Sequence, residues 1–177
     1  FEKENINTLT ESSEFLITLF SGFAQAESES LSSNIQLGIR MAMKEGKVNF
    51  HYRSMLGYQR GADGKPEIVP EEAEVVRRIF RRYLEGCSEG QIQRELTQDW
   101  IATAKGVKAW SHQIVHNILT NEKYAGDALL QKTFTTDCIS KKVIKNTGQL
   151  PQTLVQNHHE GIVDRETYDA AQAEFAR

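Results

Sequence analysis

The feature that most constrains the fold is a proline-free stretch, residues 12–46, whose apolar residues recur at three- and four-residue steps. This spacing predicts a helix, about 52 Å long at 1.5 Å per residue, which exceeds what one small core can cover. Gly46 is a suitable C-terminal stop, and Lys44 lies in the expected last turn. A helix of this kind joins two bodies or packs on a partner. The residues that carry the pattern are Phe15, Leu16, Leu19, Phe20, Phe23, Leu31, Ile35 and Ile39.

The two halves of this predicted helix differ in character. The first half is apolar, whereas from Glu27 onward Ser, Glu and Asn residues dominate. An apolar half on an otherwise polar helix is typical of a surface that docks on another body or on a second copy. We therefore expect self-association through five residues, Phe15, Leu16, Leu19, Phe20 and Phe23.

Charge is distributed in blocks. The 177-residue chain has 21 Lys and Arg against 24 Asp and Glu, a net charge of −3, which taken alone argues against a nucleic-acid partner. Residues 36–60, however, carry five basic residues and one acidic residue, and residues 101–147 carry seven basic and three acidic residues. The basic residues of these segments either form a local surface that binds a polyanion or are scattered over the solvated surface. Charge alone leaves both alternatives open.

Several protein classes are excluded by the sequence. Hydrophobic residues make up 39% of the chain, but no apolar run reaches the roughly 18 residues of a membrane helix, and there is no signal-peptide pattern. Two cysteines, Cys87 and Cys138, cannot build a disulfide framework, so we expect a reducing cytoplasm and buried packing for each. Glycine-rich nucleotide loops and the nucleophile-elbow pattern are absent from the sequence.

After the long helix we expect a linker at residues 47–55, which are basic and aromatic, and then a hairpin around Asp63-Gly64. Pro70, followed by acidic residues, predicts the start of a helix that Gly86 ends. Ser88, with Gln91 three residues later, predicts a capping box at the start of the next helix, which ends near Trp100.

A third helix is predicted to begin after Ser111. One of its faces is apolar, and the opposite face carries small polar side chains, with a loop of roughly 13 residues before it, longer than the turn of a tight helix-turn-helix. This pattern is typical of a recognition helix, whose amides and imidazoles reach base edges. It is also that of an ordinary three-helix core with a solvated polar surface. The apolar face comprises Ile114, Val115, Ile118 and Leu119; the polar face comprises His112, Gln113, His116, Asn117 and Thr120.

The last third is predicted as a strand over residues 126–135, a basic polar loop, a short strand over residues 153–156, and a final helix capped by Asp164. Lysines of this region and of the earlier loops are candidate phosphate contacts, with a solvated loop as the alternative. Together with the recognition helix, the candidate DNA-binding residues are Lys44, Lys47, Arg53, Lys105, Lys108, Ser111, His112, Gln113, His116, Asn117, Lys132, Lys141, Lys142 and Lys145.

Two other constellations point to structure rather than to function. Four arginines between residues 77 and 82 resemble a phosphate clamp, but nearby Glu74 and Glu85 favour local ion pairs. His112 and His116 are four residues apart but have no Cys-x-x-Cys beside them, and His158-His159 is expected to be a surface pair, so no metal site is predicted.

In their order and spacing, the residues resemble the large serine recombinases, which include phage serine integrases and transposon recombinases. The resemblance covers nearly the whole chain. The matching pieces are residues 1–8, 24–28, 38–40, 57–58 and 68–73; Val76, Ile79-Phe80, Tyr83-Leu84, Gly86, Ser88, Ile92 and Leu96; Trp110-Ser111, Val115, Ile118-Leu119, Asn121, Tyr124 and Gly126; and His158-His159-Glu160 with Ile162-Val163.

This resemblance implies a fragment. The family's nucleophilic serine and active-site arginines would lie upstream of Phe1, and its zinc-ribbon cysteines downstream of Arg177, so this chain would need no cofactor and would be inactive alone. Residues 100–104, Trp-Ile-Ala-Thr-Ala, replace a Gly-Ile-Pro-Thr-Pro-like loop, which predicts a less rigid loop. Ser28 follows Glu27 where small resolvase relatives have Glu-Arg, so no catalytic role is transferred to Glu27.

We therefore expect a mainly α fold with a small β component, in which a long N-terminal helix precedes a helix-turn-helix-like DNA-binding domain with short hairpins. The expected segments are the tail of a catalytic domain (1–11), the linking and dimerisation helix (12–46), the recombinase DNA-binding domain (47–137), and a basic loop, strand and helix leading to a zinc ribbon (138–177).

The expected function is site recognition on double-stranded DNA for the integration or excision of mobile DNA. The parent protein, bacterial or phage-encoded, would cut through a phosphoserine link, with dimers on each site and a tetramer in synapsis. The alternatives are a non-catalytic, winged-helix-like transcription regulator and a protein-interaction module.

Overall fold

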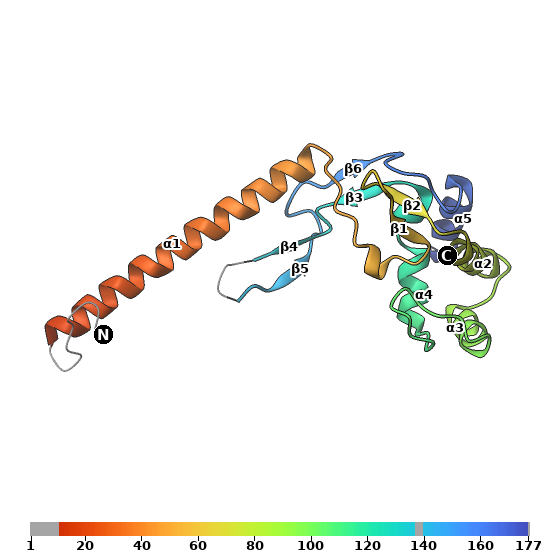
Figure 1. The fold of residues 1–177 in the computed structure, drawn as a ribbon, viewed down its shortest axis with the longest axis horizontal. Helices are drawn as coiled ribbons and strands as arrows, with labels where there is room; N and C mark the ends of the chain where they lie inside the picture. The colour runs from red at the N-terminus through yellow and green to blue at the C-terminus, as the bar shows by residue number, and fades with distance from the viewer. Residues whose placement is uncertain (1–10, 137–139, 177) are drawn as a thin grey trace. The chain divides into compact units, whose positions relative to one another are not determined.

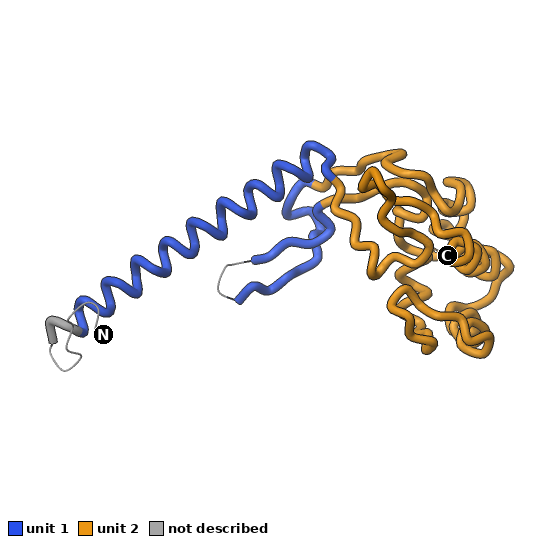
Figure 2. Tube along the Cα trace, in the orientation of Figure 1, with its two compact units in different colours: residues 1–47, 131–151 blue, residues 48–130, 152–177 orange. Residues whose placement is uncertain are grey.

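The computed structural model describes residues 11–136 and 140–176, which form two compact units (Figure 2). Unit 1 draws its described residues from 1–47 and 131–151, and unit 2 from 48–130 and 152–176. The fold is mainly helical with short antiparallel strands (Figure 1), which confirms the predicted fold class. No helix of the described residues is long and apolar enough to cross a membrane.

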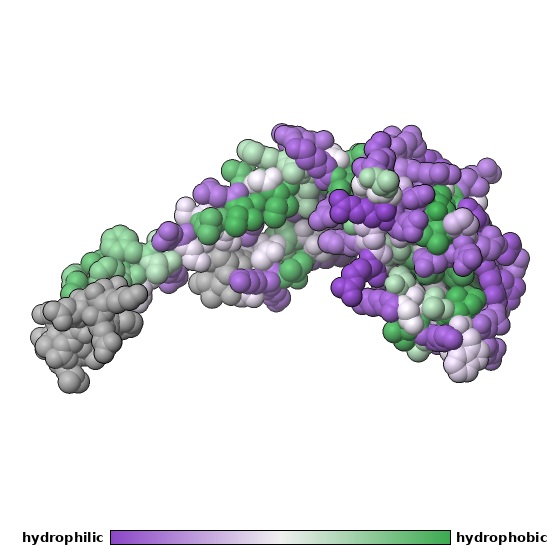
Figure 3. Space-filling model, in the orientation of Figure 1, coloured by the Kyte–Doolittle hydropathy of each residue, from purple (hydrophilic) through white to green (hydrophobic). Residues whose placement is uncertain are grey.

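Unit 1 contains the long helix α1, Glu11–Lys44, which confirms the prediction from the apolar spacing. Gly46 ends it in the left-handed region at φ +77°, and the amide of Lys47 reaches back to the carbonyl of Ala42 at 2.9 Å. This is the hydrogen-bonding pattern that favours glycine after a helix. Hydrophobic side chains remain exposed along α1 (Figure 3), including Phe15, Phe20 and Phe23.

The second part of unit 1 is a hairpin of β4, Thr133–Thr135, and β5, Val143–Lys145, paired in register at Phe134 and Ile144. Asn146, buried in this unit, closes the loop that follows. Its amide nitrogen donates to the carbonyls of Gln131 and Leu150 at 2.8 and 2.7 Å. Lys141, Lys142 and Lys145 were predicted to lie in a basic loop. The prediction is wrong for Lys145, which belongs to β5.

The single strand predicted over residues 126–135 is also wrong. Gln131 adopts φ +63° and separates β3, Ala128–Leu130, from β4. β3 pairs with β6, Thr153–Val155, in unit 2, whereas β4 pairs with β5 in unit 1. β6 confirms the short strand expected there.

The prediction of a linker at residues 47–55 is wrong beyond Lys47, because the residues that follow pack against unit 2. Phe50 and Met55 are buried in the core of unit 2, on either side of the short 3-10 helix Tyr52–Ser54. The ring of Phe50 meets those of Tyr58 and His159 edge to face, with centroids 5.4 and 5.0 Å apart. The aromatic residues of this segment therefore serve the core.

The helices of unit 2 begin where their sequence signals predict. α2, Pro70–Leu84, follows the β1–β2 hairpin (Tyr58–Arg60 and Pro66–Ile68), and α3, Glu89–Gln98, opens with the predicted capping box. In α4, His112–Leu119, Ser111 accepts from the amide of Ile114 at 3.4 Å; in α5, Arg165–Phe175, Asp164 accepts from Thr167 at 2.7 Å. These caps satisfy amides that have no partner within the helix.

The core of unit 2 lies among these helices and includes residues that are distant in the chain. Val76, Ile79 and Phe80 of α2 pack with Ile92 and Leu96 of α3 and with Val115 and Leu119 of α4. Ile162, Val163 and Ala171 belong to the same core, so residues 152–176 complete the unit that begins at Val48. The two compact units thus divide the chain differently from the four segments expected from the sequence. The boundaries of those four segments stay a prediction.

Candidate nucleic-acid interface

α4 and the loop before it form the candidate interface in unit 2. α3 and α4 pack against each other, and the loop between them, residues 99–111, is held by Trp110, whose indole nitrogen donates to the carbonyl of Ile101 at 2.9 Å. Val115, Ile118 and Leu119 of α4 are buried and Ile114 is half-buried, as predicted for its apolar face. This anchoring fixes which side chains α4 presents to solvent.

The polar residues of α4 form two rows. His112 Nε2 and His116 Nδ1 lie 2.6 and 2.9 Å from the two carboxylate oxygens of Glu89, at the start of α3. Glu89 is a buried acidic residue, so these two imidazoles supply its polar contacts. The histidine row is thus directed at α3.

Gln113 and Asn117 form the second row. Both residues are exposed, and Gln113 Nε2 donates to Asn117 Oδ1 at 2.8 Å. A hydrogen bond between side chains one turn apart restricts the rotamers of both amides. The remaining donor and acceptor groups of this amide row lie on the exposed surface of α4.

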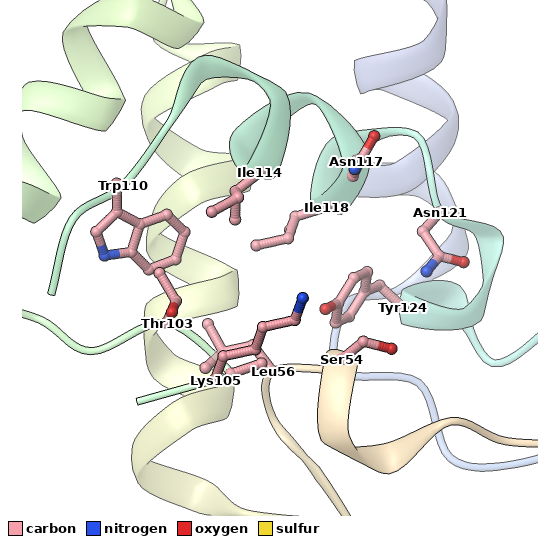
Figure 4. Close-up of a pocket in the computed structure, with 11 residues that line it drawn as sticks. Ser54, Leu56, Thr103, Lys105, Trp110, Ile114, Asn117, Ile118, Asn121 and Tyr124 are labelled. Carbon is pink, nitrogen blue, oxygen red and sulfur yellow. The ribbon is translucent and has the colours of Figure 1, made fainter. Parts of the chain in front are cut away.

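A cavity of about 250 Å³ opens beside the amide row, between α4, the 99–111 loop and the 3-10 helix of Tyr52–Ser54 (Figure 4). Trp110, Ile114 and Tyr124 form apolar walls, whereas Lys105 and Asn117 contribute polar groups to the lining. Two predicted DNA-binding residues from different elements are therefore brought to one cavity. Ser54 and Asn121 also line it and were missed by the sequence analysis.

The 99–111 loop carries two exposed lysines, Lys105 and Lys108. Within the described part of the chain Lys105 makes no ion pair, and neither does exposed Arg53. The ammonium group of Lys108 lies 5.5 Å from the ring centroid of Trp100, which is itself exposed. Unit 2 therefore presents cations beside the amide row.

The other predicted lysines belong to unit 1. Lys47 pairs with Glu45 at 2.9 Å, Lys44 lies in the last turn of α1, and the rest lie on the β4–β5 hairpin segment. Exposed side chains among them are Lys44, Lys47, Lys132, Lys141, Lys142 and Lys145.

The four arginines of α2 make ion pairs, both the predicted local ones with Glu74 and Glu85 and others that reach Glu95 and Asp99. Arg78 contacts Asp99 at 2.7 Å, and Arg82 contacts Glu95 at 2.6 Å, which links α2 to α3. The hydrogen bond from Arg82 holds the pKa of Glu95 below its usual range. Because Arg77 and Arg81 lie near Glu74, the whole group is matched by acidic residues and is not a phosphate clamp.

His158 and His159 are not the predicted surface pair. His159 Nε2 donates to the carbonyl of Lys123 at 2.7 Å, and the two Nδ1 atoms lie 3.1 Å apart. Burial lowers the pKa of both imidazoles, and the nearby Lys123 ammonium lowers them further. Cys87 is half-buried against the core, and the prediction for Cys138 lies outside the described residues.

Fold and site together define an α-rich domain that presents one amide-bearing helix beside a basic loop. The family model Recombinase matches residues 70–177, more than half of the chain. The chain therefore belongs to the recombinase family, which confirms the family predicted from the sequence and does not favour a transcription regulator.

Two known proteins show the extent of the likeness. A Bacillus subtilis (strain 168) protein named "Putative DNA recombinase" is 26% identical over 162 residues, 84% of this chain but 32% of that protein. The solved structure "Crystal Structure of a LSR-DNA Complex" is similar in fold, with a TM-score of 0.53 and 23% identity, over 81% of this chain and 38% of that one. This chain thus spans about a third of the length of these relatives.

Proposed function

We propose that this chain is a DNA-binding portion of a site-specific serine recombinase, and that α4 reads the recombination site. The observation that carries the proposal is the exposed amide row, Gln113 and Asn117, on a helix whose opposite face is buried in a recombinase-family domain. In the whole protein, strand cutting and rejoining through a phosphoserine link would belong to a separate catalytic domain.

The chemistry of the amide row suits base recognition. A glutamine or asparagine amide can bond the N6 and N7 edge of adenine bidentately, which discriminates against a wrong base by about 1–3 kcal/mol. Because Glu89 engages His112 and His116, we assign base reading to Gln113 and Asn117 and assign the histidines to holding α4 on α3.

The exposed cations suit the sugar–phosphate backbone. An ammonium group acts as a point charge, so Lys105 and Lys108 would set affinity rather than sequence preference. The lysines of unit 1 would extend this electrostatic contact, again without reading bases.

The first test separates reading from affinity. Gln113→Ala and Asn117→Ala are expected to relax preference at particular base pairs, measured by binding across a set of single-base variants of the site, while leaving the salt dependence nearly unchanged. Lys105→Ala is expected to weaken binding to all sequences and to reduce the slope of log K against log salt by about 1.

Two matched variants control for nonspecific effects. Gln59→Ala removes another exposed amide, from β1, and Lys65→Ala removes one positive charge from the hairpin turn of unit 2. If Gln113→Ala and Asn117→Ala both leave the specificity profile unchanged, α4 is not the reading helix.

The same proposal predicts that the chain forms no covalent link to DNA, because the family's nucleophilic serine is expected in another domain. Site DNA incubated with the chain should migrate as free DNA on denaturing gels. A protein–DNA adduct that survives denaturation would contradict the assignment of chemistry to a separate domain.

A further inference from the structure

Trp100 occupies a backbone position that suits glycine. It follows Asp99, the C-cap residue of α3, and lies in the left-handed region at φ +55°; its amide donates to the carbonyl of Thr97 at 3.2 Å. The next amide, of Ile101, reaches the carbonyl of Leu96 at 3.2 Å, which completes the pattern that usually ends in glycine. A residue with a Cβ atom costs about 1 kcal/mol or more there.

Packing does not explain the tryptophan. Its side chain is 72% exposed, so the ring adds little to the core of unit 2. A strained backbone position that carries a large exposed aromatic ring calls for a role in binding. The only other tryptophan in the chain, Trp110, is 4% exposed and hydrogen-bonded, and its role is structural.

The surroundings of Trp100 are suited to an anionic partner. From Trp100 to Asn121 the chain has no acidic residue, and its two cations there are Lys105 and Lys108. The acidic residue just before this stretch, Asp99, is paired with Arg78 at 2.7 Å. Lys108 places its ammonium group over the Trp100 ring, 5.5 Å from the ring centroid, so a positive charge lies next to a flat, exposed apolar surface.

We propose that Trp100 and Lys108 together contact the backbone of duplex DNA, with the indole face against a deoxyribose and the ammonium group on the adjoining phosphate. A sugar–phosphate unit offers the same pairing, an apolar C–H surface next to a negative charge. The contact lies in the loop that leads into α4, so it would set the position of α4 without reading bases. The inference rests on the proposed function and adds a contact to it.

The two tryptophans make the contact directly observable. Acrylamide should quench the fluorescence of exposed Trp100 and largely spare buried Trp110. Adding a mixed-sequence DNA duplex at low salt is expected to protect the quenchable component and shift its emission. In Trp100→Phe the remaining emission, from Trp110, should no longer respond to the duplex, although the protein still binds it.

Substitutions separate binding from folding. Trp100→Gly relieves the left-handed strain, so its melting temperature should be equal or higher, while its affinity for every sequence falls roughly three- to tenfold. Lys108→Ala should reduce the salt slope by about 1, and Lys108→Arg should restore it. Leu154→Ala, which removes an exposed apolar side chain from β6, should change neither property.

The outcomes distinguish this inference from the proposed function. If the chain binds the duplex while Trp100 stays fully quenchable and Trp100→Gly binds as tightly as the unsubstituted chain, the Trp100 contact is refuted and the reading role of α4 is unaffected. If the chain binds no duplex at all, both proposals fail.

Discussion

At the scale of single residues, contacts within one helix turn and contacts between helices hold the helices of unit 2 in place. Ser88, Ser111 and Asp164 cap helices within three residues of their partners, so a local pattern was enough to predict them. Glu89 meets His116, 27 positions away, and no local pattern marks that pair. The amide row was therefore predicted as part of one polar face, and only the packing of α3 on α4 divides that face in two.

The histidine pair predicts a dependence of stability on pH. Burial lowers the pKa of His158 and His159 in the folded protein, whereas the unfolded histidines titrate near 6.5. As pH falls below about 6.5, the unfolded state takes up protons that the folded state resists, so the free energy of unfolding should fall. The contribution of this pair should be constant at mildly alkaline pH, where both histidines are neutral in the folded and in the unfolded state.

Urea unfolding from mildly alkaline to mildly acidic pH measures this effect. His159→Gln keeps a donor for the carbonyl of Lys123 but cannot titrate, so it should flatten much of the decline; His51→Gln, at an exposed histidine, should not. The carboxyl group of Asp127, whose pKa is lowered by its bond with Arg165, acts only below about 3.8 and lies outside this window. An equal decline in both variants would refute the role of His159.

At the scale of elements, apolar spacing and capping signals predicted the α-helices, whereas the break in one strand and the packing of one segment were missed. Gln131 breaks the predicted strand at positive φ, a conformation that its side chain does not signal. The 47–55 segment was interpreted as a linker because it is basic, yet Phe50 and Met55 pack in the core. Tertiary packing, which no local pattern reports, decided the second case.

The exposed apolar stripe of α1 predicts self-association. Phe15, Leu16, Leu19, Phe20 and Phe23 are all exposed, and at helical spacing they fall within less than half of the helix circumference. Burying them between two copies would remove a continuous apolar surface from water. We expect sedimentation velocity to show concentration-dependent association of the chain.

Phe20→Asp should abolish that association by placing a charge in the stripe, and Ser33→Asp, on the polar half of α1, should not. A chain that sediments as a monomer at all accessible concentrations would show that this stripe does not drive dimerisation.

At the scale of the whole molecule, family membership could be predicted from ordered residues, whereas the grouping of segments into units could not. Residues 152–176 rejoin the core begun by residues 48–130, because Ile162, Val163 and Ala171 fill it. Segments predicted from the sequence follow chain order, whereas the compact units are defined by contacts between residues that can be far apart in the chain. The lysines predicted as one basic set are consequently shared between two units.

The pairing of β3 with β6 has a consequence for how the chain tolerates change in length. Leu130 faces Thr153 across the ladder, so the polypeptide leaves unit 2 and returns to it at neighbouring points. Residues 131–152 thus connect two strands that already pair with each other, so we expect that the length of this segment can change without disturbing unit 2.

Replacing residues 131–152 by Asn-Gly, a two-residue turn that suits a hairpin, should leave a chain whose unit 2 unfolds cooperatively at nearly the same temperature. The same deletion removes Lys132, Lys141, Lys142 and Lys145 and should lower DNA affinity. A chain that no longer folds would contradict this. In an evolving lineage, such a junction would let related proteins gain, lose or exchange a basic segment in one step while keeping unit 2 intact.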